Sequence, residues 1–588
     1  MTRSVPDAGV SLPPVAPEVS AAAVESLTTR LRRRLDAAVE SVAALPVDIA
    51  EDGTYGIRCG EDAWVTLKPG PSGTITSPDQ AHCTCLLSPR CLHRAAVLGA
   101  GPVADATPSL AEGQPTEPAA PTAPGRPSAE QVRAAGVLWT AAAAVLAAGA
   151  AAAGAVPQAE LLRAAHTARL AGLHRAESAA LGVVRRVRDA RGPQGAHRAH
   201  RPDELVAALC ELLLVTHRLR AADPDPGLIG GVPHNHRPDG PLRLYGVCRE
   251  PVVGPGGTGG VVTHLVDGTG RWYTLRDAGP GGPARARRAG TAHVAVRSFL
   301  SDHERLSRGG LVVTGAVVAP DGRLLAEPGV RATFAAGGPW ADVVPAAAVP
   351  DGTGHAPPLT RCDVEIVAAD GEEVLVRVVT AGVPGTGPTV RLAPAHRHPA
   401  LAHTANLRRL GACPGLRIRV LGRVDPDRAT TLRPLAVGPV PGAGSATLRL
   451  PGEWRDRVDL GYDLLGDEHF PLEAPCPPPL TAAEDRPVDS PLRRVRDLVE
   501  LAATGGRRAA AEPARDSDRD GHLALRRAGF ATGADLFAAL GEVAARRPRD
   551  AFGRPVADDR DHYAAQWLAT AVYLAATEAA LGRGLWHG

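Results

Sequence analysis

The feature that most constrains this chain is a group of four zinc-binding residue types within eleven positions: Cys83, Cys85, Cys91 and His93. Zinc prefers a tetrahedron of sulfur and nitrogen ligands, at about 2.3 Å and about 2.0–2.1 Å. Two cysteines at i and i+2 of an extended segment point to the same face, and the turn formers that follow can return the chain to it. The pattern predicts a closed, structural zinc site.

Other interpretations of this cluster remain open from the residues alone. Cys59 and His82 are alternative ligands, although His82 adjoins Cys83 and simultaneous chelation by neighbours is awkward. The C-x-C pair could instead have a redox role, because paired cysteines exchange disulfides readily. The cysteines could also be ordinary buried thiols.

The spacing C-x-C, short spacer, C-x-H resembles a SWIM-type zinc finger. The strand-like runs at Tyr55–Arg58 and Ala63–Leu67 and the apolar run Ala95–Leu98 fit that resemblance, which covers roughly residues 50–100. The resemblance implies a ββα module, zinc ligation by the four residues, and binding of DNA or protein. Nothing elsewhere in the chain resembles the catalytic regions of SWIM-containing transposases or kinase-related proteins.

Length and composition predict several folded domains in a reducing compartment. The chain has 588 residues, with 44% hydrophobic residues, 55 prolines and 65 glycines, which is too long for one core. Nine dispersed cysteines argue against a disulfide framework, and the N-terminus has no apolar signal region, so a cytoplasmic location is expected. Arginine almost entirely replaces lysine, Lys68 being the one lysine, which is consistent with a GC-rich genome.

One uncharged stretch, residues 134–159, is long enough to cross a bilayer. It consists mostly of alanine and glycine, which insert poorly compared with leucine or phenylalanine. We therefore expect a buried helix and no membrane association.

The pattern of apolar residues gives a multidomain α+β fold. Residues 1–100 hold an amphipathic helix over 18–45 and the zinc finger, which is too small to bury an adequate core without metal. Residues 101–128 are a Pro/Ala-rich linker, and residues 129–223 form a helical domain. Residues 235–350 and 360–450 form two β-rich domains, and residues 451–588 are mainly helical.

The β-rich region is predicted to be antiparallel and repeated. Asp-Gly pairs at 267–268, 321–322 and 370–371 lie between apolar runs, which is typical of tight hairpins. The segments that begin at Gly310 and Gly415 share the order glycine, apolar strand, glycine, turn, strand. Two small barrels or sandwiches, with an OB-like barrel as one candidate, would explain this repeat.

Three features could contact nucleic acid. Arginines and histidines gather at residues 185–201, and Arg90 and Arg94 flank the zinc cluster. Trp272 and Tyr273 could stack on bases if the region is OB-like, although a hairpin core pair is the more ordinary interpretation.

These observations predict a non-catalytic, zinc-binding protein whose partner is either protein or nucleic acid. The net charge of +2 gives no preference for nucleic acid as a whole-surface ligand. Alternatives are a protein-interaction adaptor in an ATPase-containing assembly without nucleic-acid binding, and an enzyme with an unrecognised site in 230–450. No small-molecule substrate is indicated, and no common hydrolase or Walker motif is present.

Overall fold

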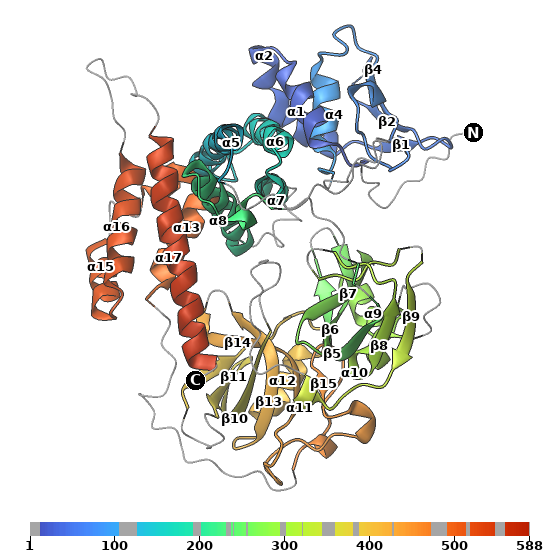
Figure 1. The fold of residues 1–588 in the computed structure, drawn as a ribbon, viewed down its shortest axis with the longest axis vertical. Helices are drawn as coiled ribbons and strands as arrows, with labels where there is room; N and C mark the ends of the chain where they lie inside the picture. The colour runs from blue at the N-terminus through green and yellow to red at the C-terminus, as the bar shows by residue number, and fades with distance from the viewer. Residues whose placement is uncertain are drawn as a thin grey trace. The chain divides into compact units, whose positions relative to one another are not determined.

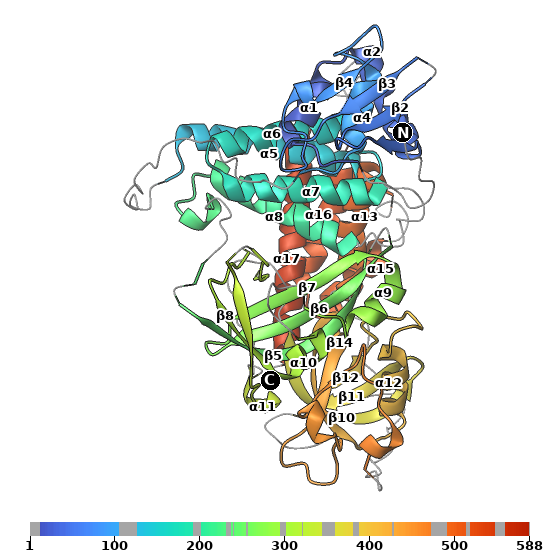
Figure 2. The ribbon, with the colours of Figure 1, turned by 90° about the vertical axis from the view of Figure 1, so that its right-hand side faces the viewer.

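The computed structural model of the chain divides into two compact units. Unit 1 comprises residues 1–232 and 494–573, and unit 2 comprises residues 233–493 and 574–588. The residues described are 12–60, 62–104, 126–191, 202–230, 237–238, 240–254, 257–294, 301–319, 322–327, 329–343, 359–379, 387–425, 428–471, 491–512, 518–546 and 559–586. Unit 1 contains one sheet and many helices, and unit 2 contains two further sheets with helices between their strands. The chain is therefore a multidomain α+β protein (Figures 1 and 2).

Unit 1 begins with a module of one sheet and several short helices, drawn in blue in Figure 1. Its four strands pair in chain order as an antiparallel meander. The strands are β1 (Val47–Ile49), β2 (Tyr55–Arg58), β3 (Trp64–Leu67) and β4 (Ala81–Cys83), and the helices are α1 (Pro17–Glu25), α2 (Thr29–Arg32), α3 (Leu35–Ala43) and α4 (Leu92–Ala100).

The single helix predicted over residues 18–45 is wrong, because three short helices occupy this segment. The chain leaves the first helix at Ser26, and Thr28 is extended (φ −66°, ψ 157°) before α2 starts. Leu27, between α1 and α2, and Leu35, at the start of α3, are both buried in the core.

The module is also larger than the predicted ββα finger. Ile57, Val65 and Leu67 from the strands pack with Leu98 of α4 and with residues of α1 and α3 in one buried cluster. Ala159 of a later helix joins the same cluster. The module therefore has an apolar core of its own beside the cysteine cluster.

Four longer helices follow: α5 (Ala129–Ala148), α6 (Ala155–Leu170), α7 (His174–Arg191) and α8 (Pro202–Arg220). They pack on one another, and α6 packs on α1. Asp36 of α3 accepts a hydrogen bond from the backbone N–H of Ala155 at 2.6 Å, which caps the start of α6.

The uncharged stretch 134–159 forms parts of two helices, not one. Helix α5 ends at Ala148, and Gly149 turns the chain with a φ of 76°. By length and composition α5 could cross a membrane. Its large side chains Leu138, Trp139 and Leu146 are buried against neighbouring helices, however, and the indole of Trp139 donates to Asp561. This packing is that of a core helix.

The chain returns to unit 1 through the helices α13 (Arg493–Ala510), α15 (Asp518–Arg527), α16 (Ala531–Ala545) and α17 (Arg560–Trp586), whose residues up to Tyr573 belong to this unit. The backbone N–H groups of Ala150 and Ala151 donate to the carbonyls of Ala503 and Thr504 on α13. Residues predicted as a separate helical end thus contribute to the first unit.

Unit 2 contains two β domains. The strands of the first are β5 (Leu242–Val253), β6 (Thr258–Asp267), β7 (Trp272–Pro280), β8 (Gly310–Thr314) and β9 (Arg331–Ala335), with α9 (Gly282–Ala289) and α10 (His303–Arg308) between β7 and β8. The strands of the second are β10 (Thr360–Asp370), β11 (Glu373–Val378), β12 (Thr389–Leu392), β13 (Arg417–Asp425), β14 (Arg428–Pro439) and β15 (Val458–Asp459), with α11 (Trp340–Val343) before them and α12 (His403–Gly411) between β12 and β13.

The two β domains share one topology. In each sheet the spatial order is third strand, second, first, fourth, fifth, and a helix lies between the third and fourth strands. In the second domain a parallel pairing of β12 with β14 closes the sheet into a barrel. In the first domain a single parallel bridge joins Thr274 of β7 to Arg323. The two repeated segments of the sequence occupy equivalent places in the two domains. Gly310 is the first residue of β8, the fourth strand of the first domain, and Gly415 lies two residues before β13, the fourth strand of the second.

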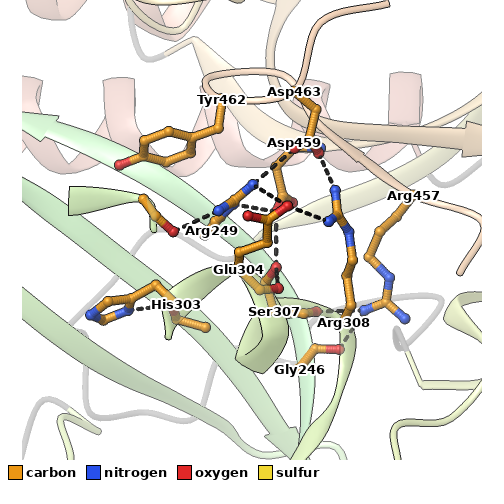
Figure 3. Close-up of polar contacts among 12 residues, drawn as sticks. Gly246, Arg249, His303, Glu304, Ser307, Arg308, Arg457, Asp459, Tyr462 and Asp463 are labelled. Atoms are coloured by element: carbon orange, nitrogen blue, oxygen red, sulfur yellow. Dashed lines mark hydrogen bonds and ion pairs between the residues drawn. The ribbon is translucent and has the colours of Figure 1, made fainter. Parts of the chain in front are cut away.

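A buried ionic network joins the two domains (Figure 3). Asp463, just after β15, accepts from Arg249 of β5 at 2.8 Å and from Arg308 of α10 at 2.7 Å. Asp459 of β15 accepts from Arg249 at 3.2 Å and from the hydroxyl of Ser307 at 3.0 Å. Carboxylates of the second domain therefore neutralise arginines of the first inside a shared interior.

Candidate metal centre

The four predicted ligands come from the end of one strand and the start of one helix. Cys83 is the last residue of β4, and Cys85 lies in the bend that follows. Cys91 is the N-cap residue of α4, and His93 lies in its first turn. The hairpin β3–β4 and the helix thus converge on one point at the edge of the module core.

The structure brings all four side chains together. Three Sγ atoms and one imidazole nitrogen lie within 4.8 Å of one another. Ligands of a tetrahedral zinc ion lie about 3.8 Å apart when each bond is about 2.3 Å. The cluster therefore has the donor set and nearly the dimensions of a Cys₃His metal site.

Two features of the donor atoms fit a metal. The buried Nδ1 of His93 has no hydrogen-bond partner among the described residues, although buried imidazole nitrogens are normally paired. The backbone N–H of Arg94 donates to the Sγ of Cys91 at 3.4 Å, as outer hydrogen bonds do for metal-bound thiolates. Burial raises the pKa of the Cys83 thiol to about 12, so a bound metal would have to displace that proton.

The alternative ligands do not join the cluster. His82 is exposed on β4, where successive side chains point to opposite faces, so its imidazole lies on the face away from Cys83. Cys59 is half-buried against the module core, and its Sγ lies 3.9 Å from the carbonyl of Ile57. Neither residue belongs to the group of ligand atoms.

Arg94 holds the backbone segments that carry the cysteine ligands, a role that the sequence did not predict. Its guanidinium is buried and donates to the carbonyls of Ala81 at 2.8 Å, Pro78 at 2.8 Å and Pro89 at 3.3 Å. These carbonyls precede Cys83 and Cys91 closely in the chain. Arg94 therefore fixes both ligand-bearing segments and is not available to a nucleic acid, whereas Arg90 is exposed.

The basic cluster at 185–201 is not a free phosphate-binding surface in the part that the structure describes. Arg188 is inserted among carbonyls and amides, donating to Gly101 at 2.7 Å and to Gln158 at 3.1 Å. Arg186 pairs with Glu204 at 2.8 Å, and Arg191 contacts the carbonyl of Ala151. Residues 192–201, with His197 and His200, lie outside the described residues.

The aromatic pair on β7 is not an exposed stacking platform. Tyr273 belongs to the core of the first β domain, and its hydroxyl donates to Asp267 at 3.1 Å. Trp272 is half-buried and packs edge-on to His264, with ring centroids 6.5 Å apart. The interpretation as a packed hairpin pair is confirmed.

Sequence reasoning also missed a polar cavity in the second β domain. Its charged lining residues, Glu373, Arg397, Asp425, Arg428 and Arg433, are spread over some sixty positions. These residues do not form a local sequence motif, and no pattern in the sequence indicates that they share one cavity. Their convergence is a product of the barrel.

Neither models of protein families nor curated proteins nor solved structures give a match to this chain. The SWIM resemblance accordingly rests on the spacing of the four ligand-type residues and on the geometry of their cluster.

Proposed function

We propose that Cys83, Cys85, Cys91 and His93 hold one structural zinc ion in a SWIM-type module. The observation that carries this proposal is the convergence of their four donor atoms to within 4.8 Å. Three thiolates and one imidazole complete the tetrahedron and leave no position for a water nucleophile. The role assigned to this metal is therefore scaffolding without catalysis.

The proposal extends to the β domains, which we infer to be OB-like. Support comes from the strand order shared by both domains, from the helix between third and fourth strands, and from the parallel closure of β12 on β14. Five-stranded Greek-key barrels of this kind bind oligonucleotides and oligosaccharides. Two such domains in tandem favour a long, flexible ligand over a small substrate.

Taken together, the function is that of a non-catalytic binding protein for single-stranded nucleic acid, with the zinc module as a further recognition element. A reducing, cytoplasmic location suits this role. None of the eight cysteines among the described residues forms a disulfide, which supports such a compartment.

A protein-binding adaptor is the second candidate, including one that serves an ATPase-containing assembly. It is favoured by Leu86 and Leu87, which are exposed on the loop between Cys85 and Cys91. Adjacent exposed leucines held by a metal-tied loop suit an apolar pocket on a protein.

Metal analysis of the purified full-length chain tests the zinc site. We expect one equivalent of Zn²⁺, and loss of at least nine-tenths of it in Cys83→Ser/Cys91→Ser. The matched control is Cys413→Ser, which alters a partly buried cysteine of the second β domain and should leave the zinc content unchanged. Undiminished metal in the double variant, or a metal-free native protein, would refute the site.

Salt dependence separates the two candidate partners. A fluorescent oligothymidylate should bind with an affinity that falls as salt rises, with a slope near −0.7 per phosphate contact. An adaptor would retain no oligonucleotide at low salt. In that case Leu86→Asp/Leu87→Asp should instead abolish capture of a protein partner from the native cell.

A further inference from the structure

Four arginines crowd the short helix α2 and the residues that end it, at the edge of the N-terminal module (Figures 1 and 2). Arg30, Arg33 and Arg34 are exposed, and Arg32 is partly buried. Residues 26–35 contain no acidic residue. This segment therefore forms a small, strongly basic surface on the module.

Three leucines hold the segment on the core of the module. Leu27 and Leu35 are buried, and Leu31 packs partly buried against the same cluster. The turns between them are fixed by backbone hydrogen bonds, such as that from the N–H of Arg34 to the carbonyl of Leu31 at 3.0 Å. Because the leucines take the inward positions, the exposed arginines project from a fixed backbone.

The three exposed arginines form no ion pair and no side-chain hydrogen bond with any residue that the structure describes. Other exposed arginines of unit 1 do find carboxylates. Arg186, for example, pairs with Glu204 at 2.8 Å, and Arg218 pairs with Asp223 at 2.8 Å. The fold therefore leaves the donors of this one basic surface to an outside acceptor.

The arrangement is unfavourable without a counter-ion. Arg30 precedes Arg33 and Arg34 by three and four positions, a spacing at which like charges on a helix repel each other. Arg32, by contrast, donates to the carbonyl of Glu25 and is committed to the module. An anionic partner over α2 would offset the repulsion among the other three.

The chemistry of this surface favours one kind of partner. Among the described residues, no large apolar side chain between positions 25 and 36 is exposed. Protein interfaces use buried aromatic and apolar anchors, and helices that lie on membranes bury an apolar face. A surface with charge alone instead suits a polymer that carries a negative charge on every unit, as a nucleic-acid backbone does.

We propose that Arg30, Arg33 and Arg34 bind the phosphate backbone of a nucleic-acid strand, an inference that rests on the proposed function. Guanidinium groups pair with phosphate oxygens, and each contact releases counter-ions from the strand. Contacts to phosphate position a strand without reading its sequence. The module with the candidate metal centre thus has a sequence-independent site of its own, in addition to any site on the β domains.

Anisotropy titration of the zinc-loaded full-length chain tests this proposal. The probe is a fluorescent oligothymidylate of about 30 nucleotides, longer than one OB-like domain covers. Arg30→Ala/Arg33→Ala/Arg34→Ala should weaken binding about tenfold or more at low salt. The slope of log affinity against log salt should become shallower by about 2.1, which is about 0.7 for each of three lost contacts.

A control variant removes the same net charge from other places. Arg133→Ala/Arg163→Ala/Arg527→Ala alters exposed arginines dispersed over α5, α6 and α15. It should change the affinity less than twofold, because these side chains do not act together. If this variant loses as much affinity as the α2 variant, net charge alone controls binding and the proposal is overturned.

Two further measurements separate a lost contact from a damaged fold. The α2 alanine variant should keep or raise the midpoint of thermal unfolding, because it removes like-charge repulsion and alanine favours the helix. The matching lysine variant, Arg30→Lys/Arg33→Lys/Arg34→Lys, keeps the charge and should bind within about threefold of the native chain. A loss with lysine as large as with alanine would contradict an ionic contact.

Polyglutamate, as a second probe, separates this inference from the proposed function. If the oligonucleotide binds the native chain and every variant equally, the nucleic-acid function stands and the α2 site fails. If the native chain binds only polyglutamate, and the α2 alanine variant loses it, the surface serves an acidic protein. The nucleic-acid function then fails, and the inference fails with it.

Discussion

At the scale of single residues, two arginines beside the candidate metal centre differ in burial and in role. Arg90 and Arg94 both flank the ligands in sequence, but Arg90 is exposed, whereas Arg94 is buried and donates to three carbonyls. Desolvation is tolerated at Arg94 because each of these acceptors satisfies a donor that water would otherwise satisfy. The residue positions the segments that carry Cys83 and Cys91.

Replacement of Arg94 should therefore destabilise the N-terminal module. We expect Arg94→Ala to lower the free energy of unfolding by about 2–4 kcal/mol, because the carbonyls of Ala81, Pro78 and Pro89 lose their donor and the bond to Ala81 is buried. Arg90→Ala should stay within about 0.5 kcal/mol of the native value. Urea denaturation of the zinc-loaded protein measures both, and equal effects would show that the hydrogen bonds of Arg94 contribute little.

At the scale of elements, unit 1 depends on a close approach of two turns. Gly149 ends α5 with a φ of 76°, and Gly506 interrupts α13 with a φ of 77°. A Cβ on Gly506 would lie 2.4 Å from the carbonyl oxygen of Ala148. Both positions need glycine. Their φ angles are positive, and backbone atoms of the other turn occupy the space in which a Cβ would lie.

Gly506→Ala should consequently destabilise unit 1 by about 2–3 kcal/mol, through strain and overpacking. The control is Gly136→Ala inside α5, where a Cβ would meet nothing within 4 Å. That substitution should stabilise the protein by up to about 1 kcal/mol, because alanine is the better helix former. Thermal unfolding of both variants measures the difference, and shifts of the same sign would contradict this account.

At the scale of the whole molecule, the two β domains of unit 2 share an interior. Arg249, Asp459 and Asp463 are all nearly inaccessible, with side chains 3%, 0% and 6% exposed. Around them Trp340, Leu359 and Leu421 form an apolar cluster with residues of β5 and β14. The ionic network adds directional contacts to this burial, and we expect these contacts to favour one orientation of the domains.

Breaking the network should uncouple the two domains. Asp463→Asn leaves Arg249 and Arg308 with too little negative charge, and we expect unit 2 to lose about 3–5 kcal/mol. Asp467→Asn, at an exposed partner of Arg409, should have an effect below about 0.5 kcal/mol. Differential scanning calorimetry tests this, and an unchanged profile for Asp463→Asn would argue against coupling.

Much of the local structure of this protein could be predicted from its sequence, because it depends on residues that lie close together in the chain. The ligand group of Cys83, Cys85, Cys91 and His93 could be predicted because its members lie within eleven residues, where turn geometry alone brings them together. The hairpin at Asp370 and the helices near residues 205–219 and 562–581 were predictable for the same reason, since their periods are local.

Only the tertiary structure decided which side chains are buried and which distant segments meet. Nothing local distinguishes Arg94 from Arg90, or predicts that α13 returns to α5 and that β12 pairs with β14. These contacts depend on long-range burial, whose free energy depends on the surface that the completed fold removes from water. The charge around the barrel cavity follows from that closure, because its arginines become neighbours only when the strands do.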